Sequence, residues 1–330
     1  MSQLTSNTTA FIEAQQYSQF ILDNLHDFLL PEGMYRDVSD FGSGTTLNIK
    51  TVGTVTLQDA AEDTPLNFTN IDTGTVTLAI TDYIGDAWKV SDELREDGSQ
   101  IDTLMAMRAM ESTRALGENH ETRMLATADA AQSKAGGTAG LNLINGRPHR
   151  WVGSAAGNAR TVRLQDFISM KLAFDKANAP AGGRIAIVDP VVEATLNSLT
   201  NLVSVDSNPH FEGIVNEGFA RDHKFIKNIF GWDVYTSNFL PTLTATEALN
   251  ASGYGLTSET AAVGDKVNVF MCVADDSCKP VMNAWRRAPA TEGWRAEEER
   301  ADKYQVTSRF GFGAQRVDTL GVIITHPSNY

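Results

Sequence analysis

Alternation of apolar and polar positions is clearest in two Thr-rich stretches, residues 45–57 and 74–84. In the second stretch, Val76, Leu78 and Ile80 fall on one face of an extended chain, and threonines dominate the other face. Side chains of a β-strand point alternately to its two faces, and β-branched residues favour strands. Both stretches are therefore predicted to be strands with one apolar face.

The first stretch places Leu47 and Ile49 on a shared face, but its alternation changes phase near Val52 and Gly53. A phase change of this kind predicts a β-bulge. A polar, acidic tip joins the two strands, so we expect one long hairpin. Because a two-stranded ribbon is only marginally stable alone in water, the hairpin should lie on another surface, for which a neighbouring subunit is a good candidate.

Two segments have the periodicity of amphipathic helices. The first covers residues 10–30, and its apolar stripe consists of Tyr17, Ile21, Leu25 and Phe28. The second runs from Ser99 to about Ala128 without a proline, and a helix of that length would extend roughly 45 Å. The expected buried side of this long helix is marked by Ile101, Met105, Leu116 and Met124.

The middle of the chain has a mixed α/β pattern that begins after a predicted flexible break at residues 132–140. The elements expected there are a helix over 163–178, a strand over 185–189, a helix begun by Asp189 and Pro190, a strand within 231–241 and a strand over 267–275. Residues 242–266 are rich in Thr, Ala, Ser and Gly, which predicts an exposed loop or insertion. Alternation returns over 303–316 and 320–327, so the fold class is α+β.

Composition limits the classes of function. The chain has 330 residues, of which 42% are hydrophobic and 21% charged, as in ordinary globular proteins. It has no apolar run long enough to span a membrane and no Lys or Arg before Arg36, so we expect a soluble protein without a signal peptide or membrane partner. The formal net charge of −14 argues against a nucleic-acid binder, which needs concentrated Lys and Arg. Cys272 and Cys278, the only two cysteines, are expected to be structural thiols.

The one candidate catalytic group is Ser237, in the stretch "GWDVYTSNFLP" at residues 231–241. No G-x-S-x-G motif surrounds Ser237, and Pro241 follows where a catalytic elbow would continue into a helix. "HETRM" at residues 120–124 lacks the second histidine of a zinc protease, and "GFGAQR" at 311–316 lacks the third glycine of a dinucleotide site. The residues therefore predict no enzyme, no cofactor and no catalytic, cofactor-binding or metal-binding residue.

The order of these parts resembles that of the major capsid proteins of tailed bacteriophages, which have the Hong Kong 97-like fold. Four segments are similar to parts of that family: "IGDAWKVSDELREDG" (84–98), "GGRIAIVDPVVEATL" (182–196), "FIKNIFGWDVYTSNFLP" (225–241) and "SRFGFGAQRVDTLGVII" (308–324). The first resembles the passage from the E-loop to the spine helix, the next two resemble strands and a helix of the A-domain, and the last resembles the closing strands of the P-domain.

The resemblance implies a division of the chain into five parts. These are an N-terminal arm (1–42), an E-loop hairpin (43–84), a first P-domain part with the spine helix (85–162), an α/β A-domain (163–279) and P-domain C-terminal strands (280–330). Ser237 and Asn238 would then end an A-domain strand, with their polar groups bound to local backbone as in Asx and Ser/Thr turns.

The implied function is self-assembly through pentamers and hexamers into an icosahedral shell around the double-stranded DNA of a tailed phage. Such a protein would assemble in the bacterial host cytoplasm and reside in the virion. Its partners would be copies of itself, a portal and a separate scaffolding protein, and it would enclose DNA without sequence-specific binding. Some relatives form a lysine–asparagine crosslink, but Lys50, the only lysine of the hairpin, lies in a strand rather than at the tip, so no crosslink is predicted.

Other readings remain open at this stage. An encapsulin, the shell protein of a bacterial nanocompartment, has the same fold and encloses an enzyme cargo. A serine hydrolase that uses Ser237 belongs to a different class, because triad partners can come from anywhere in a chain. A tail or decoration protein fits the long helix and the α/β middle less well.

Overall fold

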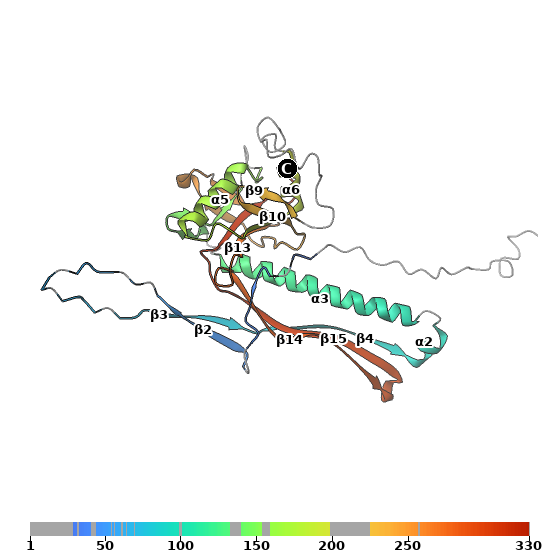
Figure 1. The fold of residues 1–330 in the computed structure, drawn as a ribbon. Coiled ribbons are helices and arrows are strands. Elements are labelled where there is room, and N and C mark those ends of the chain that lie inside the picture. Colours follow the sequence, from blue (N-terminus) through green and yellow to red (C-terminus); the bar gives the residue numbers. More distant parts are fainter. Residues whose placement is uncertain are drawn as a thin grey trace, which may run out of the picture.

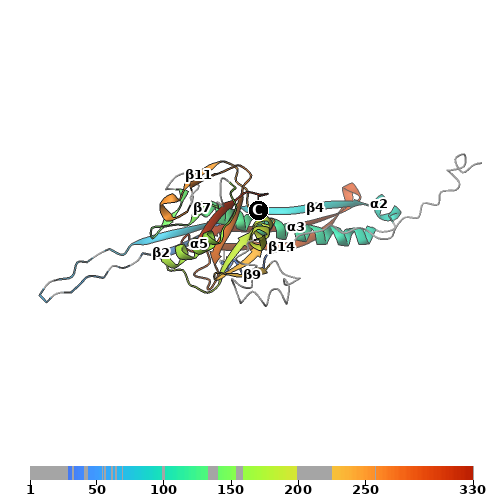
Figure 2. The ribbon, with the colours of Figure 1, turned by 90° about the horizontal axis from the view of Figure 1, so that it is seen from above.

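The computed structural model describes residues 29–31, 33–40, 44–53, 55, 57–60, 62–63, 65–68, 70–98, 101–132, 140–153, 159–198, 225–256 and 258–329. A long helix and a narrow sheet form an extended part, and a second sheet with its helices forms a compact lobe near one end of that helix (Figures 1 and 2). Most of the predicted helix over 10–30 and of the predicted break over 132–140 lies outside the described residues.

The predicted hairpin is present and projects away from both parts (Figure 1). Its strands β2 (Thr46–Val52) and β3 (Thr73–Ala79) pair antiparallel in continuous register. The predicted bulge is wrong, because β2 ends at Val52 and the Gly53 N–H closes the pairing on the Asp72 carbonyl at 2.9 Å. The apolar face is confirmed: Leu78 is buried, with Leu47 and Ile49 packed against the same cluster.

The predicted second strand divides in two. β3 stops at Ala79, where the Ile80 N–H donates to the Thr45 carbonyl, and β4 (Asp82–Ser91) leaves the hairpin to join another sheet. That four-stranded sheet has the order β1-β14-β15-β4, with β1 at Arg36–Asp37, β14 at Val281–Ala296 and β15 at Ala301–Ala314. β14 and β15 are joined through the short 3-10 helix η4 (Glu297–Glu299).

The long helix is confirmed as α3 (Ile101–Ala131), preceded by the short α2 (Asp92–Asp97) that the Ser91 hydroxyl caps. α3 lies along the four-stranded sheet and reaches the compact lobe with its C-terminal end (Figure 1). Leu116 and Met124 are buried as predicted, whereas Ile101 and Met105 are only half-buried. The last turns of α3 share a core cluster with strands of the lobe through Leu125 and Ala128.

The compact lobe is built on a six-stranded mixed sheet of order β7-β16-β13-β8-β10-β9. Its strands are β7 (Arg150–Val152), β8 (Arg184–Val188), β9 (Phe225–Ile229), β10 (Trp232–Thr236), β13 (Lys266–Cys272) and β16 (Leu320–Thr325), and its helices are α5 (Leu164–Lys176) and α6 (Pro190–Ser198). The predicted cap of α6 is confirmed, because the Val191 N–H donates to the Asp189 carboxylate at 3.1 Å.

One expectation for this region is wrong. Residues 242–266 are not a simple exposed loop: they form β11 (Glu247–Asn250), the 3-10 helix η3 (Ser252–Tyr254) and β12 (Ser258–Ala261), with Leu249 and Leu256 buried in the core of the lobe. β16, which the sequence resemblance groups with the closing strands of the P-domain, pairs with β13 and β7 in the six-stranded sheet. A small hairpin of β5 (Leu143–Ile144) and β6 (Arg147–Pro148) precedes β7.

A buried group of charges connects α3 to the lobe. The guanidinium of Arg150 is fully buried and donates to Asp129 of α3 at 2.9 Å and to both carboxylate oxygens of Glu247 at 3.0 Å. Bidentate, charge-assisted bonds of this kind are among the stronger polar contacts in proteins.

Among the described helices, none is long and apolar enough to cross a membrane.

We predict that Gly311→Ala detaches the hairpin from the sheet. A Cβ at Gly311 would lie 2.8 Å from Ile80 Cα and still closer to the Ala79 carbonyl oxygen, and backbone atoms cannot turn away as a side chain can. We expect a loss of about 1–3 kcal/mol in the free energy of unfolding, measured by urea denaturation. Gly253→Ala is the matched control, because nothing lies within 4 Å of its added Cβ. Equal stability of the two variants would contradict the close approach.

Candidate functional site

Ser237 lies just after β10 and has only 1% of its surface exposed. Its hydroxyl donates to Glu121 Oε1 at 2.6 Å and accepts the Phe239 N–H at 3.2 Å. The second bond is the local turn that the sequence predicts for this corner. The first bond fixes the hydroxyl proton on a carboxylate of α3, so Ser237 serves as a structural contact.

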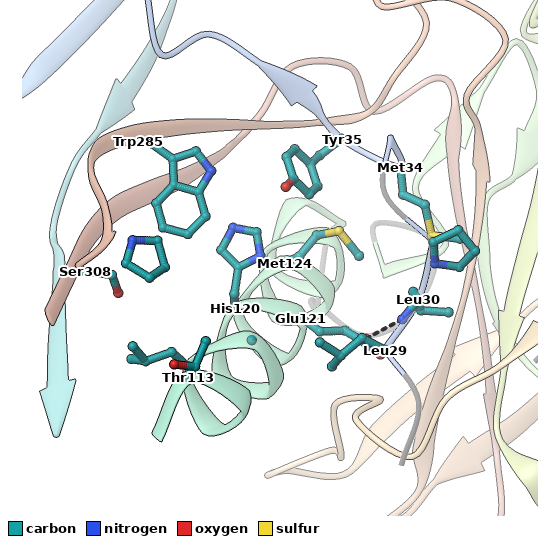
Figure 3. Close-up of a pocket in the computed structure, with 14 residues that line it drawn as sticks. Leu29, Leu30, Met34, Tyr35, Thr113, His120, Glu121, Met124, Trp285 and Ser308 are labelled. Carbon is teal, nitrogen blue, oxygen red and sulfur yellow. Dashed lines mark hydrogen bonds between the residues drawn. The ribbon is translucent and has the colours of Figure 1, made fainter. Parts of the chain in front are cut away.

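Glu121 is the point where three segments of the chain meet. Its side chain is buried on α3, and its second oxygen, Oε2, accepts the Leu30 N–H at 2.8 Å (Figure 3). The carboxylate thus holds the arm on one side and the end of β10 on the other. Hydrogen bonds to a charged acceptor are stronger than neutral ones, and this burial makes the loss of either donor costly.

Beyond Leu30 the arm continues along the four-stranded sheet. β1 pairs in parallel with β14 through Arg36 and Asp37, and the Trp285 N–H donates to the Ser39 hydroxyl at 2.8 Å. Met34 is buried in the cluster shared by α3 and the lobe. The arm is therefore bound to its own subunit at Leu30, Met34, Arg36, Asp37 and Ser39.

An apolar pocket of about 300 Å³ lies between this arm, α3 and β14 (Figure 3). Its lining residues are Leu29, Leu30, Pro31, Met34, Tyr35, Thr113, Leu116, Gly117, His120, Glu121, Met124, Trp285, Pro289 and Ser308. The His120 ring stacks on Trp285 with centroids 4.7 Å apart and also contacts Tyr35, Phe310 and Phe312. Burial in this aromatic cluster lowers the pKa of His120 to about 4.

The far portion of the hairpin exposes many apolar side chains. Val52, Val55, Leu57, Leu66, Phe68 and Ile71 are all exposed, and Phe68 and Leu57 are almost completely so. Exposed apolar area beyond scattered single residues is uncommon in monomeric proteins and often marks a protein–protein interface. Sequence reasoning described this tip only as polar and acidic; Leu57, Leu66 and Phe68 were the signal that it missed.

Charged residues gather at the end of the extended part that lies away from the hairpin. Arg295 binds both carboxylate oxygens of Asp92 at 2.8 and 2.9 Å and also contacts Asp302, which pairs in turn with Arg95. The hydrogen bond from Arg295 lowers the pKa of Asp92. These pairs are exposed, so each contributes little alone, but together they connect α2, β14 and β15.

The other candidate motifs lie in regular helix and strand. "HETRM" lies within α3 and "GFGAQR" begins within β15. Cys272 is buried in the core of the lobe, and burial raises the pKa of its thiol, whereas Cys278 is half-buried; both thiols are free. Within the described residues, no group of three or more His, Cys, Asp or Glu side chains is arranged to hold a metal ion.

The comparisons with known proteins agree with this arrangement of hairpin, long helix and lobe. A sequence profile described as "Phage capsid protein" matches residues 72–325. The chain belongs to the phage capsid protein family. It functions as a major capsid protein, which is a structural component of the virion. A search of curated proteins found no match.

Solved structures share the fold of this phage capsid protein at low sequence identity. A structure from Mycobacterium phage Che8 has a TM-score of 0.65 and 17% identity, and covers 94% of this chain and 97% of its own. The capsid structure of the cyanophage P-SCSP1u has a TM-score of 0.69 and 16% identity over 95% and 93% of the two chains. The mature capsid of bacteriophage PhiM1 has a TM-score of 0.69 and 13% identity over 98% and 96%. The Hong Kong 97-like fold expected from the sequence is thus confirmed.

We predict that Ser237→Ala lowers the free energy of unfolding by about 1–3 kcal/mol, because the buried Glu121 carboxylate loses a donor. Thr122→Ala removes an exposed hydroxyl from the adjacent helix position and should change stability by less than about 0.5 kcal/mol. Thermal unfolding of both variants measures the difference. Indistinguishable midpoints would show that the Ser237–Glu121 bond contributes little.

We predict that His120→Phe makes the protein less sensitive to acid. The folded pKa of about 4 lies below the ordinary 6.5, so the stability that neutral His120 provides is complete above pH 6.5 and is lost as the pH falls toward 4. Phenylalanine keeps the aromatic packing but cannot be protonated. Thermal midpoints measured from pH 7 to 4 should fall further for the wild type than for the variant.

Burial also raises the pKa of Asp166 to about 6, and that contribution has the opposite direction: it is lost as the pH rises through 6. It is present in both proteins, so the difference between the two curves reports His120. Parallel curves for wild type and variant would contradict the prediction.

Proposed function

We propose that this chain is the shell subunit that assembles through pentamers and hexamers into an icosahedral capsid around the double-stranded DNA of a tailed phage. The observation that carries the proposal is the projecting hairpin, whose apolar residues from Val52 to Ile71 are exposed in the single subunit. A ribbon with exposed apolar side chains gains stability only when another surface covers it. We propose that an adjacent copy of the chain supplies that surface.

One surface suited to such a contact is the groove of about 340 Å³ at the distal end of the extended part. Trp88 stacks on Tyr304 there, with centroids 5.9 Å apart, and Ile101 and Met105 of α3 line it as well. The ion pair between Arg95 and Asp302 also lies in this lining. The groove thus offers apolar and aromatic area to the hairpin of a neighbour. Head-to-tail contacts of this type close into rings when the rotation between copies allows it.

Many such contacts per subunit stabilise a closed shell even when each is weak, because each contact raises the effective concentration for the next. The same weakness lets misplaced subunits leave.

We propose that a separate scaffolding protein and a portal take part and that assembly occurs in the bacterial host cytoplasm. We also propose that Lys50, which lies on β2 away from the tip, forms no crosslink.

The net charge of −14 fits a container for DNA better than a DNA binder. An acidic inner surface would not hold the genome as it enters, and salt screens the repulsion beyond roughly 8 Å. DNA is thus enclosed without sequence-specific contacts in this proposal.

The two alternative functions, an encapsulin-type shell and a serine hydrolase, predict a different content or activity. An encapsulin-type shell has the same fold and would hold an enzyme cargo instead of DNA. A serine hydrolase is disfavoured by the burial of Ser237 and by its bond to Glu121, and we propose that the protein is not an enzyme. Ester turnover by the purified protein that disappears in Ser237→Ala, with the fold retained, would favour the hydrolase.

The test is negative-stain electron microscopy of the protein expressed in bacteria with and without its neighbouring genes. We expect closed polyhedral shells, or hexamers and pentamers on sizing, and DNA rather than an enzyme as the content of mature particles.

Phe68→Asp should abolish shells while leaving a folded subunit, because it places a charge in the apolar contact of the hairpin. Val263→Asp, at another exposed apolar position in the lobe, is the matched control and should still assemble. A stable monomer under every condition would contradict the proposal.

A further inference from the structure

The regular pairing of the hairpin ends well before its tip. β2 and β3 pair in continuous register as far as Val52 and Thr73, and one backbone bond of 2.9 Å joins the next pair, Gly53 and Asp72. Beyond this point, the described residues between 55 and 70 are not in regular strand. We call the two chain segments that continue β2 and β3 the limbs of the hairpin.

One side chain connects the two limbs again near their far end. Nε2 of Gln58 donates to the Asn67 carbonyl oxygen at 2.9 Å, and Oε1 of Gln58 accepts the Asn67 N–H at 3.0 Å. Residues of neighbouring antiparallel strands exchange the same two bonds through their backbones. The side-chain amide of Gln58 thus takes the place of a strand neighbour, and we call this pair of bonds the Gln58 clasp.

The clasp lies in the register of β2 and β3. Val52 stands opposite Thr73, and six further residues along each limb bring Gln58 opposite Asn67. A slip of one residue between two strands would turn every side chain of one limb to the other face. Among the pairings open to the limbs, the clasp therefore selects the one that β2 and β3 already have.

This register gathers exposed apolar residues on one face, because strand side chains return to the same face at every second residue. Leu57 lies eight residues after Ile49, and Phe68 lies eight residues before Val76. Leu66 lies two residues before Phe68 and shares its face. Ile49 and Val76 pack on the apolar cluster at the base of the hairpin. The face that is apolar at the base is therefore apolar again at the far end.

The apolar pair beside the clasp is open in the single subunit. Leu57 stands opposite Phe68 in this register, yet Leu57 is 90% exposed and Phe68 is fully exposed. Cross-strand pairs stabilise a sheet through the contact of their side chains, and these two side chains make almost none. The clasp thus fixes the register, whereas burial of the apolar face requires the surface of a partner.

We propose that Gln58 is a positioning residue for the contact between subunits. Its clasp fixes the register of the limbs, so that Leu57, Leu66 and Phe68 meet an adjacent copy of the chain on one face. The limbs then close as a strand pair on that contact without a search for register, which lowers the ordering cost of binding. This inference rests on the proposed function, in which an adjacent copy covers the hairpin.

Disulfide trapping in the full-length isolated subunit measures the register, in a Cys278→Ser background that removes the half-buried thiol. Leu57→Cys is combined with Phe68→Cys, its partner in the register, or with Leu66→Cys, which is two residues out of register and closes a shorter loop. We expect the in-register disulfide to form at least threefold faster when Gln58 is present. In Gln58→Ala the two rates should agree within about twofold, because a free loop gains slightly from the shorter closure.

Gln58→Glu is a variant of nearly the same shape that has no donor for the Asn67 carbonyl, so it should lose the preference as well. All the substituted positions of the hairpin are exposed, and the subunit should fold as the wild type does. Equal rates with Gln58 present, or a preference that survives both Gln58→Ala and Gln58→Glu, would overturn the proposal.

The yield of shells under the conditions of the electron microscopy test gives a second readout. Gln58→Ala should lower this yield at least fivefold. Asn70→Ala, which removes another exposed amide from the same hairpin, is the matched control and should assemble as the wild type does. Full assembly of Gln58→Ala would overturn the inference and leave the proposed function intact. A wild type that shows the register preference but never assembles would overturn the proposed function, and with it the role of Gln58 between subunits.

Discussion

Helix α3 packs against both sheets, and the relation between the two parts of the molecule depends on this double contact. Along its middle, His120 stacks on Trp285 of the four-stranded sheet; near its end, Leu125 and Ala128 share a core with strands of the six-stranded sheet. Asp129 adds an ion pair with the buried Arg150. Breaking a buried pair leaves an uncompensated charge, which is far more costly than losing an exposed one. A rigid helix held at both places keeps the lobe in one position relative to the sheet.

Glu121 connects the arm to α3 by buried hydrogen bonds in the same way. Its position on α3, one residue from His120, places one carboxylate between the Leu30 N–H and the Ser237 hydroxyl. Displacing the arm would leave an oxygen of this buried group without its donor, as would displacing the end of β10. The arm and the lobe are thus coupled through a helix that belongs to neither.

The sequence predicted the elements whose signal is local. The long α3 and the alternation of Leu78 and Ile80 follow from spacing within a few residues. Sheet membership was harder, because β16 finds its partners β13 and β7 by contacts distant in sequence. The hairpin of β11 and β12 was missed because its apolar positions are sparse among small polar residues. The bond between Ser237 and Glu121 spans 116 positions, and no spacing rule could reveal it.

The close approach of Gly311 to Ala79 and Ile80 fixes the base of the hairpin but not its far end. At about 3.4 Å per residue, the seven residues of β2 alone reach roughly 24 Å from that base. A tilt of about ten degrees at the base would therefore move the end of β2 by roughly 4 Å, on the length given by that rise. The hairpin therefore acts as a lever, because a small rotation at its base becomes a larger displacement at its far end while the core of the subunit remains unchanged.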